Sequence, residues 1–184
     1  MGEQLWEALR GYKDGRNLRV RERHLLRVAA TLHRFLRDHA QCIRDAAGDE
    51  WEVVTIVPSK RDRPDHPLER AVALGRDLRR LYRPLLAPRQ VDQIDRVYGS
   101  DNGFTATEEA AGQRVLLLDD TFASGATFQS AASALSLAGA TVVAGVVVGR
   151  VIATGDPQHP VRDEFWERQS RMPFTFDVCC LEQG

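Results

Sequence analysis

The sequence has few of the residues that build disulfide frameworks or metal centres. Its three cysteines are Cys42, Cys179 and Cys180, so two are adjacent, the third is distant, and no C-x-x-C pair occurs. We therefore expect reduced thiols. The five histidines lack the spacing of metal ligands, and we expect surface or packing roles for all of them. They are His24, His33, His39, His66 and His159.

Long apolar runs are also missing. No run approaches the roughly 18 residues that span a bilayer, and the first residues, MGEQLWEALRGYKDGR, contain no secretory apolar stretch. We therefore expect a cytoplasmic protein that does not associate with a membrane. The 184 residues fit a single domain. Within it we expect a helical segment over 1–48, a ligand-binding core over 49–150, and a tail of unknown role over 151–184.

Lysine is scarce, and the charge is unevenly distributed. Lys13 and Lys60 are the only lysines among many arginines. Each is a candidate for a specific role, because lysine and arginine side chains are not interchangeable. The net charge of −1 makes nucleic acid an unexpected partner without excluding it. Basic residues gather between Arg10 and Arg44, which suits either a phosphate-rich ligand or a solvated helix face.

Apolar periodicity predicts alternating strands and helices. Continuous apolar runs predict buried strands, whereas helical spacing and a closing Gly139 predict amphipathic helices. The expected strands are 51–57, 94–98, 115–118 and 141–148, with an edge strand at 174–179, and the expected helices are 4–12, 18–36, 68–81 and 126–138. We expect residues 98–109 to form a mobile loop. The pattern predicts an α/β protein with a mainly parallel sheet, which binds ligands after Val57 and Asp119 at the carboxyl ends of its strands.

The most informative segment is VLLLDDTFASGATF, residues 115–128. A buried strand ends in Asp119 and Asp120, a small-residue loop follows over 121–125, and a helix begins near Ala126. Small side chains allow backbone N–H groups to approach an anion, and the helix N-terminus adds donors and partial positive charge. The two carboxylates could accept hydrogen bonds from vicinal hydroxyls or face a metal ion. The segment therefore predicts a site for a phosphorylated sugar.

Three other interpretations of this segment are weaker. A Walker B strand needs a partner loop GxxxxGK[ST], and a Rossmann site needs GxGxxG, and the sequence contains neither. A structural turn with a capping residue would explain one acidic residue, but not two followed by a loop of small residues.

Residues 115–127 resemble the motif by which type I phosphoribosyltransferases bind 5-phosphoribosyl-1-pyrophosphate (PRPP). The resemblance implies a mainly parallel sheet of about five strands with helices on both faces. It also implies that Asp119 and Asp120 contact the ribose hydroxyls. The residues implied to hold the 5-phosphate are Thr121, Ala123, Ser124, Gly125, Ala126 and Thr127.

A second loop resembles the pyrophosphate loop of the same family. It is Pro58-Ser59-Lys60-Arg61, and the resemblance implies that Ser59, Lys60 and Arg61 bind pyrophosphate. Lys60 joins Asp119 and Asp120 as an expected catalytic residue. Mg²⁺ is the expected cofactor, bridging pyrophosphate and ribose, with the two aspartates as indirect ligands. More loosely, residues 8–150 resemble the ComF-like subgroup, through ALRGYKDGRN in the N-terminal helix and Asn102-Gly103-Phe104.

The resemblance implies a pentosyl glycosyltransferase of nucleotide metabolism, which moves phosphoribosyl from PRPP to a nitrogen acceptor and releases pyrophosphate. The acceptor is not identified, and Ala123 argues against the hypoxanthine and guanine branch, which has an acid there. No general base stands out among the candidates Asp101, Glu108 and Glu109. Three alternatives stay open: a PRPP- or nucleotide-sensing regulator, a ComF-like accessory protein for DNA uptake, and a phosphoribohydrolase or sugar-phosphate binder. A homodimer is also left open.

Overall fold

The computed structural model describes residues 2–14, 17–59, 66–89, 103–156, 160–171, 175–179 and 181. The expected strand at 94–98 lies outside these residues. In chain order, the helices and strands are α1 Gly2–Asp14, α2 Leu18–Ala47, β1 Val53–Ile56, α3 Pro67–Ala73, α4 Arg76–Leu81, β2 Leu86–Pro88, β3 Phe104–Ala106, the 3-10 helix η1 Glu108–Ala110, β4 Arg114–Phe122, α5 Ala126–Leu137, β5 Thr141–Arg150 and α6 Pro160–Arg171.

A parallel sheet organises the fold, which confirms the α/β class. Its strand order is β1-β4-β5, with β4 in the centre and parallel to both neighbours. These strands are the three apolar runs that the sequence predicts. The expected count of about five strands is not met in the described part of the chain. There the parallel sheet has three strands, and the antiparallel pair β2-β3 forms a separate sheet.

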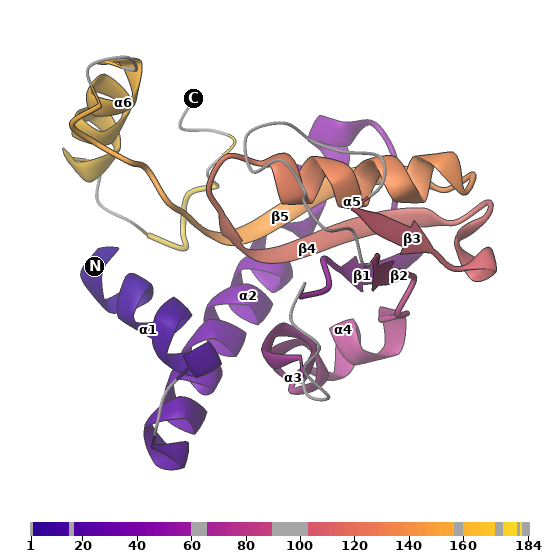
Figure 1. Ribbon diagram of the computed structural model, residues 1–184, viewed down its shortest axis with the longest axis horizontal. Helices are drawn as coiled ribbons and strands as arrows, with labels where there is room; N and C mark the ends of the chain where they lie inside the picture. Colours follow the sequence, from indigo (N-terminus) through magenta and orange to yellow (C-terminus); the bar gives the residue numbers. More distant parts are fainter. Residues whose placement is uncertain are drawn as a thin grey trace.

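Helices cover both faces of the parallel sheet. In Figure 1, α5 lies along one face, and α1 to α4 lie on the other. The central strand contributes to both layers because successive side chains of a strand point to opposite faces. Leu116 and Leu118 pack in the core that includes α2, whereas Val115 and Leu117 pack in the core that includes α5. All four side chains are fully buried.

The long helix α2 is the main support of the α1 side. It extends eleven residues beyond the predicted 18–36, because buried His39 and Ile43 continue its apolar face. The helix begins at Asn17, whose side chain accepts hydrogen bonds from the backbone N–H groups of Arg19 and Val20. It ends at Gly48, which has the left-handed conformation common after helices, with a φ of 68°. No helix among the described residues is long and apolar enough to cross a membrane.

The predicted helix over 68–81 is two helices in the structure. α3 and α4 meet at Leu74-Gly75, and Gly75 is the N-cap of α4. A Cβ atom at this glycine would overlap the His33 imidazole of α2, so only glycine permits the close approach. The apolar spacing continues across this break, which explains why periodicity alone predicted one helix.

Two segments near the strands also differ from expectation. The second half of the predicted mobile loop is ordered, because β3 pairs with β2, and Phe104 and Ala110 are buried. Its first half lies outside the described residues. The predicted edge strand at 174–179 is wrong for its described part, since residues 175–179 form bends and no strand. They pack instead against α2, where the His39 ring hydrogen-bonds the carbonyl of Phe176.

The Asn17 cap offers a test of how α2 is held. We expect Asn17→Ala to lower the free energy of unfolding by about 1 kcal/mol, because two N–H groups of the first turn lose their acceptor. Urea unfolding would measure the change. Asn17→Asp keeps an acceptor and should retain most of the stability. Equal stability of the wild type and Asn17→Ala would show that the cap contributes nothing.

Candidate functional site

The candidate site lies where β4 projects past its neighbour β1. The last registered pair between them joins Ile56 to Leu118, and the Val57 N–H donates to the Leu118 carbonyl at 2.9 Å. On its other side β4 stays paired with β5 as far as Phe122. The strand is therefore longer than predicted, and the loop before α5 is only residues 123–125. Asp119 and Asp120 lie within the strand, at the carboxyl edge of the sheet.

Asp120 is tied to the first helix. Its side chain accepts a hydrogen bond from the Tyr12 hydroxyl, and the Lys13 Nζ lies 2.7 Å from its Oδ1 atom. Asp120 is buried, and Lys13 keeps part of its surface exposed. Burial, reinforced by the nearby Asp120 carboxylate, raises the pKa of Tyr12 far above its ordinary value, so its hydroxyl stays protonated and able to donate. Both carboxylate oxygens of Asp120 therefore have partners.

Asp119 has a different environment. As the neighbour of Asp120 in a strand, it projects to the opposite face, towards α5. Its Oδ1 atom accepts a hydrogen bond from the Asp120 backbone N–H at 2.7 Å. Burial, followed by the charge of Asp120, raises the pKa of Asp119 to about 7. At neutral pH this carboxyl group can thus accept or donate a proton, unlike an ordinary surface aspartate.

The loop after β4 leads directly into the N-terminus of α5. Gly125 is the N-cap of α5 with a φ of 85°, and no side chain at that position caps the helix. The positive φ favours glycine, and a Cβ atom there would come 2.5 Å from the tip of the Phe122 ring, which would have to shift. Ala123 and Ser124 are exposed, and the Ser124 Oγ accepts from the Ala126 N–H at 3.3 Å. The anion cradle that the sequence leads us to expect at this loop stays a prediction.

A cavity opens beside α1 at the same edge of the sheet. Its volume is about 600 Å³. Its lining includes Lys13, which pairs with Asp120, and Thr121, which follows Asp120 in β4. His24 also lines it, and its buried Nδ1 atom has no hydrogen-bond partner in the described part of the chain. The remaining lining residues are Trp6, Glu7, Leu9, Arg10 and Gly11.

The structure does not bring every expected site residue to the aspartates. Lys60, Arg61 and Asp101 are outside the described residues, whereas Ser59 is described and follows the end of β1. Glu108 and Glu109 form η1, which precedes the start of β4. They are therefore at the amino end of the strand, and Asp119 lies roughly 16 Å further along it at 3.3 Å per residue. They do not join the aspartates in one site.

The structure adds Tyr12 and Lys13 to the candidate site. Sequence analysis gave them no contact with the aspartates, because 108 and 107 residues separate them from Asp120. Two signals were present: lysine is rare in this chain, and both residues lie in the N-terminal segment that carries the looser ComF-like resemblance. Neither signal identified their partner.

Comparison with known proteins assigns neither a family nor a function to the chain. No family model matches the chain, and no curated protein matches it significantly. Among solved structures, the chain is similar to one described as the allosteric regulatory enzyme of purine biosynthesis, with 22% sequence identity and a TM-score of 0.44. The match covers 70% of this chain and 27% of that one, so the chain spans about a quarter of that enzyme's length. A likeness at this TM-score carries no functional argument.

The raised pKa of Asp119 predicts a pH-dependent stability. The folded state holds this proton more tightly than the unfolded chain, whose aspartate has a pKa of 3.8. The stabilisation that comes from protonated Asp119 is therefore fully present below pH 3.8 and is lost as the pH rises towards about 7. We expect wild-type stability to fall relative to Asp119→Asn between about pH 4 and about pH 7, by no more than about 1.4 kcal/mol per pH unit, and to stay level above that range. The free energies of unfolding would be measured in urea at several pH values. A difference between the two proteins that stays constant with pH would contradict the raised pKa.

Proposed function

We propose that the chain binds PRPP at the carboxyl end of β4 and acts as a phosphoribosyltransferase of the type I class. One observation carries the proposal. A buried parallel strand presents two aspartates and then, after a three-residue loop, the glycine-capped N-terminus of a helix. The 5-phosphate would lie at residues 123–127, where the loop and the first turn of α5 offer N–H donors. Thr121 precedes this cradle in the strand.

The two aspartates have separate roles in this proposal. Asp119 accepts hydrogen bonds from the ribose hydroxyls, because Asp120 is already held by Tyr12 and Lys13. Asp120 positions Lys13, whose charge then lies at the edge of the site. Ser59, Lys60 and Arg61 follow β1 and would bind the pyrophosphate, since carboxylates cannot neutralise it.

Magnesium fits the oxygen donors of this site. Mg²⁺ prefers carboxylate and phosphate oxygens, and Asp119 is better placed to hold it than Asp120, whose oxygens both have protein partners. When bound, the ion would neutralise charge that develops on the departing pyrophosphate. The protein's own residues bind the phosphate, orient the ribose and place positive charge beside the leaving group.

The cavity beside α1 offers room for a nitrogen acceptor. It reaches Thr121 and Lys13 at one end, and Trp6 provides an aromatic surface on which a planar base can stack. In the transfer itself, the acceptor nitrogen forms a bond to ribose C1, the bond from C1 to pyrophosphate breaks, and the acceptor's proton passes to a base or to water.

One observation favours a second candidate, a PRPP- or nucleotide-sensing regulator. Of the three acidic residues considered as the general base, the two that the structure describes are at the far end of the sheet. A sensor needs the cradle and the ribose contacts but no such base. Both candidates predict PRPP binding, whereas only the enzyme releases pyrophosphate in the presence of an acceptor.

The proposal is tested by binding and turnover together. We expect calorimetry to show Mg²⁺-dependent PRPP binding that weakens about 10- to 150-fold in Asp119→Asn, because a charged hydrogen-bond acceptor is lost. A panel of nitrogen bases should then identify an acceptor through release of pyrophosphate. Binding without release would favour the sensor. If PRPP does not bind, or binds Asp119→Asn equally well, the proposed function is wrong.

Gly125 provides a test of the phosphate cradle alone. We expect Gly125→Ala to weaken binding of both PRPP and ribose 5-phosphate, because the new Cβ would displace the Phe122 ring or the loop. The matched control is Gly112→Ala, since Gly112 also has a positive φ, 75°, but has open space around it. Each change should cost about 1–2 kcal/mol of stability through its backbone conformation. Equal affinities for the two variants would show that the loop does not hold phosphate.

A further inference from the structure

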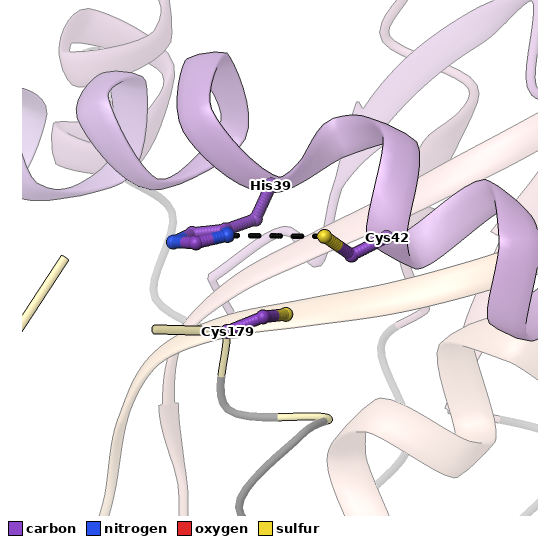
Figure 2. A group of neighbouring side chains, drawn as sticks. All are labelled: His39, Cys42 and Cys179. Atoms are coloured by element: carbon purple, nitrogen blue, oxygen red, sulfur yellow. Dashed lines mark hydrogen bonds between the residues drawn. The ribbon is translucent and has the colours of Figure 1, made fainter. Parts of the chain in front are cut away.

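A histidine and two cysteines meet where the C-terminal tail packs on α2. Figure 2 shows His39 and Cys42 one helical turn apart on α2, with Cys179 facing them from the tail. Their potential ligand atoms all lie within 4.8 Å of one another. Cys179 and His39 are buried, at 1% and 6% exposure, and Cys42 is partly buried. Sequence analysis considered the cysteines and histidines separately and missed this group.

The hydrogen bonds of His39 define which nitrogen is available. Its Nε2 atom lies 2.7 Å from the Phe176 carbonyl, which can only accept, so Nε2 carries the hydrogen. In neutral imidazole the Nδ1 atom then has a lone pair. Nδ1 faces the Cys42 Sγ at 3.9 Å. A backbone carbonyl that fixes the ring through its second nitrogen is the usual arrangement for a metal-binding histidine.

The spacing of the three atoms suits a small tetrahedral ion. Zinc–sulfur bonds of about 2.3 Å and zinc–nitrogen bonds of about 2.1 Å place neighbouring ligands roughly 3.5–3.8 Å apart. The observed separation of Nδ1 and Cys42 Sγ is 3.9 Å, and the largest separation is no more than 4.8 Å. Side-chain shifts of about an ångström or less would close the site around the ion.

We propose that His39, Cys42 and Cys179 form a zinc site that fastens the C-terminal tail to α2. Zinc binding would convert both thiols to thiolates and release two protons, and a fourth position would remain for water or another ligand. The site is distinct from the aspartate site on β4 and does not depend on the PRPP proposal. Bound zinc would link two segments of the chain that are separated by more than 130 residues of sequence.

A disulfide between the two cysteines explains the cluster less well. It would join the sulfurs but leave the buried Nδ1 atom of His39 without a strong partner, which costs free energy. A metal ion uses all three groups at once.

The surrounding contacts also favour a fixed tail. The Arg34 guanidinium lies over the Phe176 ring, 4.3 Å from its centroid, and the centroids of the Phe35 and His39 rings are 5.3 Å apart.

Cobalt binding to the full-length chain tests the site, because Co²⁺ replaces zinc and reports its ligands by absorption. The protein is purified with reductant, stripped of metal with a chelator and titrated with Co²⁺. We expect one equivalent to bind, with thiolate-to-cobalt charge-transfer absorption and tetrahedral d–d bands that Zn²⁺ abolishes. Cys42→Ser, Cys179→Ser and His39→Ala should each reduce affinity at least about tenfold and weaken the absorption.

His33→Ala is the matched control. His33 is on the same helix and also hydrogen-bonds a backbone carbonyl, that of Ala71 at 2.9 Å, so its loss disturbs α2 without touching the cluster. This variant should bind Co²⁺ like the wild type, and circular dichroism shows which variants are folded. Zn²⁺ should also raise the melting temperature of the wild type and of His33→Ala, but not of the three cluster variants.

Three results would overturn the assignment. The first is no charge-transfer absorption in the wild type, including the case in which Cys42 and Cys179 form a disulfide that survives reductant. The second is binding that persists unchanged in the cluster variants. The third is loss of binding in Cys180→Ser together with normal binding in Cys179→Ser, which would place the tail ligand at the other cysteine.

Discussion

The contact between Asp120 and the first helix is the constraint on which the candidate site depends. A buried carboxylate is costly to remove from water unless it is paired and hydrogen-bonded, and Tyr12 and Lys13 supply such partners for Asp120. Helix α1 must therefore pack over the carboxyl end of β4. Since the same helix supplies most of the cavity wall, this one contact also determines where the cavity lies.

Adjacent placement in a strand gives the two aspartates different surroundings. Successive side chains alternate between faces, so Asp120 points to the α1 side and Asp119 to the α5 side. Asp120 is anchored by Tyr12 and Lys13, whereas Asp119 is partly buried beside it and has its pKa raised to about 7. The pair therefore combines a structural role with a proton-exchanging one. Two acids at positions i and i+2 would lie on the same face of the strand and would share one environment.

Features of the fold that depend on residues near one another in the sequence could be predicted, whereas features that depend on distant residues could not. Strand β4, helix α5 and the Gly125 turn were predictable, because continuous apolar residues and local backbone chemistry define them. The contact of Tyr12 and Lys13 with Asp120 was not, since nothing local links residues 108 positions apart. The break at Gly75 depends on the His33 ring of another helix, and the extension of β4 to Phe122 depends on pairing with β5. The same limit hid the cluster of His39, Cys42 and Cys179.

Both ends of the described chain pack on α2, although they do so at different places. Gly11 of α1 lies against His24 in the first third of α2, so closely that a Cβ atom would meet the imidazole. The tail meets α2 further along, through Arg34 and His39. The helix is continuous between these positions, with its buried face in one core cluster that also contains Tyr12 and Leu118. A change that tilts α2 at the tail contact would therefore also move the surface on which α1 rests, and with it the Lys13 contact to Asp120.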